Sequence, residues 1–326
     1  MRRGHRTARL LCAAALATAL LPLGCAGVRR GPGEPAAPAA TPLLWHARAP
    51  GSGDLYLLGS VHLRAVDSAA LAPEIQQAYA DSSELVVEVD LSSVSPEEGR
   101  ASIEGYAMLP PQLTLDALLS PETRELLARY LKSRNLPADP IQRYKPWFVA
   151  QLVLVIELRA EGYDDALGVD RAFIDQASGE KSIVGLETIA SQFAMLDGLS
   201  LDLQELMLKD TLLRIDELEG TTRRLLEAWS DGDEAELERQ IFQPLAEVPE
   251  LGPYYDALIW QRNASMAARL VELAGDGRTR FVVLGAGHMV GARGIPARLA
   301  EQGFVVDRIR ADGASRAPDA AVAPPP

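Results

Sequence analysis

Short apolar runs alternate with longer stretches of helical periodicity along the middle of the chain. Six runs have the length and composition of strands: 43–47, 54–58, 84–89, 182–186, 280–284 and 304–309. The first two, joined by Pro-Gly-Ser-Gly, predict a hairpin. Helical patterns cover 73–80, a long section from 121 to 260, and 296–302. This order predicts an α/β fold with a central, mostly parallel sheet, flanking helices and a large helical insertion.

The first 24 residues have the composition of a signal peptide. Four arginines precede an apolar run from Leu10 to Leu23, which is too short to span a bilayer comfortably. The run ends in Leu-Pro-Leu-Gly-Cys, which resembles a bacterial lipobox cut before Cys25, although Pro22 stands where such motifs usually carry Leu. We therefore predict that Cys25 is lipidated and anchors the chain to a membrane, with ordinary secretion or an uncleaved anchor as alternatives.

The remaining chain divides into one domain and two flanking segments. Residues 25–42 are rich in Pro and Ala and predict a tether, and residues 311–326 have a similar composition that predicts a disordered tail. Residues 43–310 are enough for one domain with a full core. Because Cys12 lies in the predicted leader and Cys25 would carry the lipid, this domain has no disulfide and no cysteine zinc site.

The charge of the chain narrows the classes of partner. The formal net charge is −13, and it becomes −17 if the leader, with its four arginines and no acidic residue, is removed. No basic stripe interrupts this acidic body, so we expect no nucleic-acid binding. An acidic body favours solubility and the binding of cations.

Two predicted strands end in the same pattern, an apolar run that reaches a glycine and then a histidine three residues later. Gly59 precedes His62, and Gly285 precedes His288, in a chain that has only four histidines. Glycine at these positions would let the chain turn tightly and let another backbone approach. The shared context suggests that the two imidazoles are halves of one site.

Two carboxylates complete this set. Like His62 and His288, Glu88 and Glu187 follow predicted central strands, and ligands of parallel sheets bind beyond the carboxyl ends of the strands. Imidazole and carboxylate together suit a borderline divalent metal such as Mn, Co, Fe or Zn. The competing interpretation is structural: a hydrogen-bonded histidine, a solvated strand end at Glu88, and a surface arginine at Arg262. Motifs of serine hydrolases, P-loops, dinucleotide folds and H-E-x-x-H metalloproteases are absent from the sequence.

The motifs resemble those of the TraB/GumN family, which is related to the Tiki metalloproteases. The matching segments cover nearly all of residues 43–310: 56–63 (YLLGSVHL), 86–90 (VVEVD), 143–147 (RYKPW), 168–170 (GVD), 185–188 (GLET), 262–263 (RN) and 285–291 (GAGHMVG). Tiki-like members are described as metal-dependent proteases whose two G-x-x-H histidines and glutamates form the active site. The resemblance implies metal ligands at His62, Glu88 and His288.

The same resemblance implies an activity. We expect Glu187 to act as general base and Arg262 to hold a carboxylate or developing oxyanion, although the sequence leaves the roles of the two glutamates interchangeable. The expected protein is a cell-envelope lipoprotein, at the outer membrane or facing the periplasm, with a metal-dependent hydrolase, a peptidase, acting on peptides or proteins. Mn or Co is favoured, with Zn or Fe as further candidates. The alternatives are a haem- or ligand-binding lipoprotein of the ChaN type without catalysis, and a partner-binding scaffold with a degenerate site.

Overall fold

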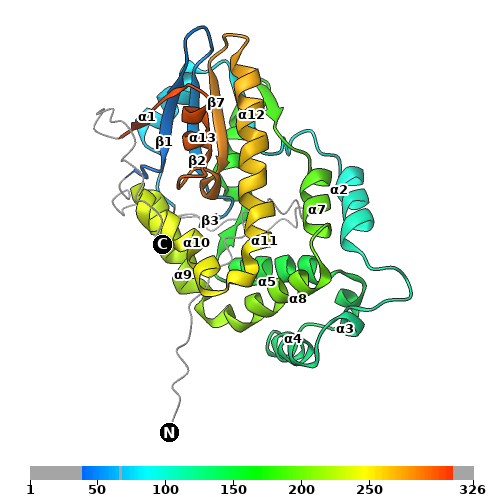
Figure 1. Cartoon of the computed structure of the whole chain (residues 1–326). Helices are drawn as coiled ribbons and strands as arrows, with labels where there is room; N and C mark the ends of the chain where they lie inside the picture. Colours follow the sequence, from blue (N-terminus) through cyan, green and yellow to red (C-terminus); the bar gives the residue numbers. More distant parts are fainter. Residues whose placement is uncertain (1–38, 66–67, 311–326) are drawn as a thin grey trace.

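The computed structural model describes residues 39–65 and 68–310, so the predicted signal peptide, Cys25 and the predicted tail lie outside the described residues. Within them, six strands form one sheet (Figure 1). In spatial order they are β6 (Ser182–Gly185), β4 (Glu84–Val87), β7 (Arg280–Gly285), β2 (Leu55–Ser60), β1 (Leu44–Arg48) and β8 (Val305–Ile309). The first four run parallel, whereas β1 pairs antiparallel with both β2 and β8. The predicted α/β fold, its mostly parallel sheet and the predicted hairpin are therefore confirmed.

The central strands are covered on both faces, which explains their nearly uninterrupted apolar sequences. Leu85 to Val87 and Phe281 to Leu284 are almost completely buried. Helices α1 (Pro73–Asp81) and α6 (Val169–Ala177) pack against β7, where the rings of Tyr79, Phe173 and Phe281 meet. Helix α13 (Ile295–Glu301) contacts β1 and β8, and α12 (Arg262–Ala274) lies beside α13 (Figure 1).

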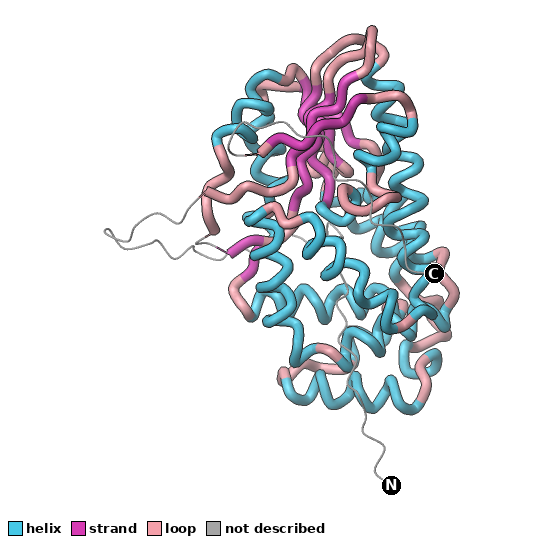
Figure 2. The backbone as a smooth tube through the Cα atoms, turned by 60° about the vertical axis from the view of Figure 1, so that its left-hand side comes forward, coloured by secondary structure: helices cyan, strands magenta, loops and turns pink. Residues whose placement is uncertain are grey.

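The helical insertion begins earlier than predicted, at residue 96 instead of 121. Its α-helices are α2 (Pro96–Ser102), α3 (Leu115–Leu118), α4 (Pro121–Ser133), α5 (Pro146–Ala160), α7 (Ile189–Asp197), α8 (Leu201–Leu213), α9 (Leu218–Asp231), α10 (Glu234–Glu247) and α11 (Gly252–Tyr255). Two π-helices, η1 (Ile103–Ala107) and η6 (Asp256–Gln261), and four 3-10 turns, η2 (Asp139–Arg143), η3 (Asp165–Leu167), η4 (Ile215–Glu217) and η5 (Pro249–Leu251), join them. Figure 2 shows most of this helical part below the sheet.

A second, two-stranded ladder joins β3 (Arg64–Ala65) to β5 (Tyr163–Asp164). No pattern in the sequence indicated this ladder, because two residues are too few to show a strand periodicity. The ladder links the segment that follows β2 to the chain just before α6. It therefore holds two segments, about one hundred residues apart along the chain, side by side.

The helical part has an apolar core of its own next to the strand ends. It contains aromatic side chains such as Trp147, Phe193 and Tyr255, together with Val89 and Ile189, which follow β4 and β6 closely. The edge of the sheet where the parallel strands end is thus backed by packed side chains. In the described part of the chain, no helix combines the length and the apolar character needed to span a membrane.

Candidate active site

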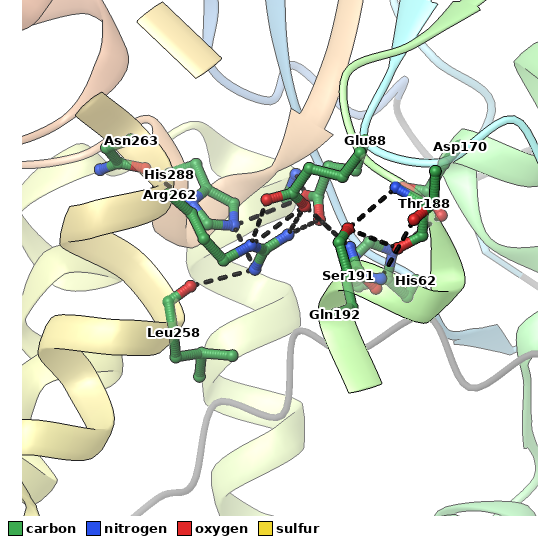
Figure 3. Close-up of polar contacts among 12 residues, drawn as sticks. His62, Glu88, Asp170, Thr188, Ser191, Gln192, Leu258, Arg262, Asn263 and His288 are labelled. Atoms are coloured by element: carbon green, nitrogen blue, oxygen red, sulfur yellow. Dashed lines mark hydrogen bonds and ion pairs between the residues drawn. The ribbon is translucent and has the colours of Figure 1, made fainter. Parts of the chain in front are cut away.

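The four predicted side chains leave the sheet at one edge. His62, Glu88 and Glu187 follow β2, β4 and β6 within two residues, and His288 ends the 3-10 turn η7 (Ala286–His288) after β7. Since these strands are parallel neighbours, their carboxyl ends lie side by side. The predicted convergence of segments at this edge is therefore present (Figure 3).

Arg262 lies at the centre of this group, where α12 begins. Its Nε donates to the Glu187 carboxylate at 2.9 and 3.1 Å, and its Nη2 donates to Glu187 Oε2 at 2.6 Å and Glu88 Oε2 at 2.7 Å. Its Nη1 donates to the Leu258 carbonyl at 3.0 Å and lies 3.2 Å from His288 Nε2. The side chain is buried, so one guanidinium bridges segments that come from three strands.

Glu88 is an ionised carboxylate held from several directions. Its Oε1 accepts a hydrogen bond of 2.7 Å from the backbone amide of Gly285, opposite the bond that its Oε2 receives from Arg262. Burial opposes its charge, but the positive charges of nearby Arg262 and His62, together with the hydrogen bond from the Gly285 amide, hold the pKa of Glu88 well below its usual range. Its charge is therefore kept over the physiological pH range.

His288 is neutral, and its tautomer follows from its partner. Asn263 Nδ2 donates to the Arg293 carbonyl at 2.8 Å, which turns Asn263 Oδ1 toward His288 Nδ1 at 2.6 Å. An amide oxygen only accepts, so Nδ1 carries the proton and Nε2 presents its lone pair to Arg262. Complete burial lowers the pKa of His288 to about 3.

His62 has the opposite character. Its Nδ1 lies 2.8 Å from Asp170 Oδ2, while its Nε2 is buried and has no hydrogen-bond partner. Burial lowers the pKa of His62, but the charge and hydrogen bond of Asp170, with a contribution from Glu88, outweigh it and raise the pKa to about 9. At neutral pH His62 is therefore an imidazolium whose Nε2–H points at no acceptor in the described chain.

Gly168 brings Asp170 to His62. A Cβ atom at position 168 would lie 2.5 Å from the carbonyl oxygen of His62, and the next amide, of Val169, donates to the Val61 carbonyl at 3.0 Å. Helix α6 can thus begin directly against the backbone of the first G-x-x-H motif, which places Asp170 within reach of the ring.

The glycines of the two G-x-x-H motifs act through their backbones. Neither Gly59 nor Gly285 has a positive φ. A Cβ at Gly59 would make only ordinary contacts, the nearest at 3.5 Å from Ala286. The Gly59 carbonyl accepts from Trp229 Nε1 at 2.8 Å, and the Gly285 amide holds Glu88. A much closer backbone approach than that at Gly59 occurs at Gly168.

The side chains as placed do not fit the predicted divalent metal. Among residues 39–65 and 68–310, no group of three or more His, Cys, Asp and Glu side chains is arranged to hold a metal ion. Of the predicted ligands, Glu88 and His288 face the guanidinium of Arg262, and His62 pairs with Asp170. Metal binding stays a prediction from the sequence.

Three residues that the sequence analysis did not select hold the predicted ones. Asp170 and Asn263 orient the two histidines, and Gln192 Nε2 donates to Glu187 Oε2 at 3.0 Å and approaches Glu88 Oε2 at 3.5 Å. Asp170 and Asn263 lie inside the quoted Gly-Val-Asp and Arg-Asn motifs, which was the available signal. For Gln192, on the first turn of α7, no local pattern pointed to the site.

Comparison with known proteins assigns the family. The chain is 24% identical over 256 residues to YbaP of Escherichia coli strain K12, a protein named as uncharacterized. The matched region covers 77% of this chain and 89% of the relative. YbaP of Shigella flexneri gives the same identity and coverage. No solved structure matches the chain. The model of the TraB/PrgY/gumN family matches residues 43–308, nearly the whole predicted domain, and the chain belongs to this family.

Proposed function

We propose that this protein hydrolyses amide bonds of peptides and that His62 donates the proton to the leaving nitrogen. The observation that supports this proposal is the buried Nε2 of His62, which has no partner while Nδ1 is held by Asp170. An unpaired buried polar atom costs about 1–3 kcal/mol unless a ligand satisfies it. A site that keeps such an atom at the carboxyl ends of parallel strands is suited to bind a polar reacting group.

The charge of His62 sets its role. Because its pKa is raised, the imidazolium presents Nε2–H at neutral pH, and a carbonyl oxygen, or the nitrogen of a tetrahedral intermediate, placed there would accept that hydrogen bond. Hydrolysis breaks the carbon–nitrogen bond, adds hydroxide from water to the carbonyl carbon and leaves a proton on the nitrogen. In this proposal His62 donates its proton to the leaving nitrogen and recovers one from the water.

Arg262 and Glu187 have a supporting role in this proposal. The sequence suggested that Glu187 acts as base and that Arg262 holds an oxyanion, but these two groups are paired with each other. We assign them, with Glu88, to a fixed charged framework beside His62. The Asp170 carboxylate stabilises the imidazolium and orients its ring, as buried carboxylates do for catalytic histidines.

We also propose a cell-envelope location, at the outer membrane or facing the periplasm, with a lipid anchor on Cys25. The support is the charged and apolar leader that ends at this cysteine. Labelling of the expressed chain with a radioactive or clickable fatty acid tests the anchor. The label should be lost in Cys25→Ser, and equal labelling of both proteins would contradict the proposal.

The activity is tested by turnover of mixed fluorogenic peptides by the purified full chain. His62→Ala should abolish turnover and leave the circular dichroism spectrum unchanged. The matched control is His46→Ala, because His46 Nε2 also pairs with an aspartate, Asp54, at 2.8 Å but near the start of β2. Turnover that survives His62→Ala would refute the assignment.

The binding alternative predicts a different signal. An unpartnered imidazole nitrogen that gives up its proton can also ligate haem iron. Haemin added to the full chain should then show a shifted Soret band, and the shift should be absent with His62→Ala. If this is observed and no peptide is cleaved, the haem-binding function replaces the hydrolase.

A further inference from the structure

We propose that the guanidinium of Arg262 is the resident cation of this site and takes the place that the sequence pattern assigns to a divalent metal ion. The inference rests on the contacts of Arg262 and does not depend on the proposed hydrolysis. Its test therefore measures binding of an ion instead of turnover.

The donors of Arg262 are saturated. A guanidinium has five N–H groups in a planar fork. The Nε–H bonds to Glu187, the two Nη2–H groups to Glu187 and Glu88, and the two Nη1–H groups to the Leu258 carbonyl and His288 Nε2. All five therefore have an acceptor within the chain.

The acceptors are the lone pairs that a metal would need. Two carboxylates and one neutral imidazole nitrogen converge on the guanidinium, and they come from the ends of β4, β6 and β7. The exposed fraction is 6% for Arg262, 5% for Glu88 and 0% for His288, so these groups are shielded from water. The buried Glu88 carboxylate and the partly buried Glu187 carboxylate would be unfavourable without a cation, and Arg262 supplies that cation.

The backbone before α12 holds the guanidinium in place. Arg262 follows the π-helix η6, and its backbone N–H bonds to the Ile259 carbonyl. The Leu258 carbonyl, which an α-helix would pair with that amide, accepts instead from Nη1 of the Arg262 side chain. The irregular turn thus provides a backbone anchor for the side chain at the centre of the site.

A specific consequence follows for divalent ions. Removing the guanidinium would free two carboxylates and one imidazole nitrogen that all face it, and these donors, once they close in on the vacated space, are a set suited to Mn²⁺. Arg262→Ala should therefore create a Mn²⁺ site that the natural chain lacks. Replacing Glu88 as well, in Arg262→Ala/Glu88→Gln, should remove it again.

The experiment is a Mn²⁺ titration of the purified full chain, followed by the electron paramagnetic resonance signal of the free ion. The matched control is Arg269→Ala, which removes an exposed arginine of the same helix that pairs with Glu272 at 2.7 Å. We expect neither the natural chain nor this control to bind Mn²⁺ in a manner that depends on Glu88. Arg262→Ala should bind one Mn²⁺ ion at least about tenfold more tightly than the natural chain does, because the positive charge of the guanidinium is gone.

Two results would overturn the proposal. One is stoichiometric Mn²⁺ binding by the natural chain that Glu88→Gln abolishes, which would make the metal the resident cation. The other is a folded Arg262→Ala protein that binds no more tightly than the natural chain. If Arg262→Ala does not fold, the comparison of the natural chain with Glu88→Gln decides, and absence of Glu88-dependent binding supports the proposal.

Discussion

His62 and His288 occupy the same position of two G-x-x-H motifs, yet their Nδ1 atoms are held by chemically different partners. His62 faces the carboxylate of Asp170 at 2.8 Å, and His288 faces the amide oxygen of Asn263 at 2.6 Å. The carboxylate favours an imidazolium and the amide does not. The pKa of His62 is consequently raised to about 9, whereas burial lowers the pKa of His288 to about 3.

This difference predicts the pH dependence of turnover. If His62 acts as the proton donor, kcat/KM should fall as the pH rises through about 9, where the imidazolium loses its proton. Asp170→Asn removes the charge that favours the imidazolium, so the alkaline limb should move to lower pH. A pH profile for both proteins measures this shift. Asp54→Asn, next to His46, is the control, and an unmoved limb in Asp170→Asn would contradict the assignment.

Gly168→Ala should destabilise the protein and disturb the His62–Asp170 pair. The added Cβ would lie 2.5 Å from the His62 carbonyl oxygen, a backbone atom with little freedom to move. We expect a loss of about 1–3 kcal/mol in the free energy of unfolding, measured by urea denaturation. Gly99→Ala, where nothing lies within 4 Å of the new Cβ, is the control and should cost little. Equal stabilities of the two variants would show that the backbone at 168 can relax.

Arg262→Ala should lower the free energy of unfolding by about 3–5 kcal/mol, because it leaves the buried Glu88 carboxylate and the partly buried Glu187 carboxylate without their cation. The double variant Arg262→Ala/Glu88→Gln should lose less than the sum of the two single changes, since one uncompensated charge is also removed. A double-mutant cycle in urea gives this coupling. Strict additivity would mean that the pair at 2.7 Å contributes no interaction of its own.

A second buried ion pair allows stability to be separated from function. Arg280 Nε donates to Glu84 Oε2 at 2.6 Å at the starts of β7 and β4, the end of the sheet opposite to the site. Glu84→Gln should reduce stability by about 1–3 kcal/mol and leave the kcat and KM of peptide turnover unchanged. Thermal unfolding and steady-state kinetics measure the two effects. A large change in kcat would show that the site depends on this distant pair.

The sequence by itself determined the six strands of the main sheet and the place of the candidate site. Strands covered on both faces need continuous apolar runs, so Leu85 to Val87 and Phe281 to Leu284 could be recognised as central strands. A polar residue that follows such a run lies where the strand ends, at the carboxyl-terminal end of the sheet. That rule placed His62, Glu88, Glu187 and His288 at one end of the sheet.

The tertiary structure decided how those residues are paired. Asp170 reaches His62 across 108 positions of the chain, and Arg262 reaches Glu88 across 174. Such contacts depend on the path of helices α6 and α12 over the sheet, which periodicity does not encode. The charge of each histidine, and the guanidinium at the position expected for a metal, follow from these long-range contacts because a pKa and a binding site depend on neighbours in space.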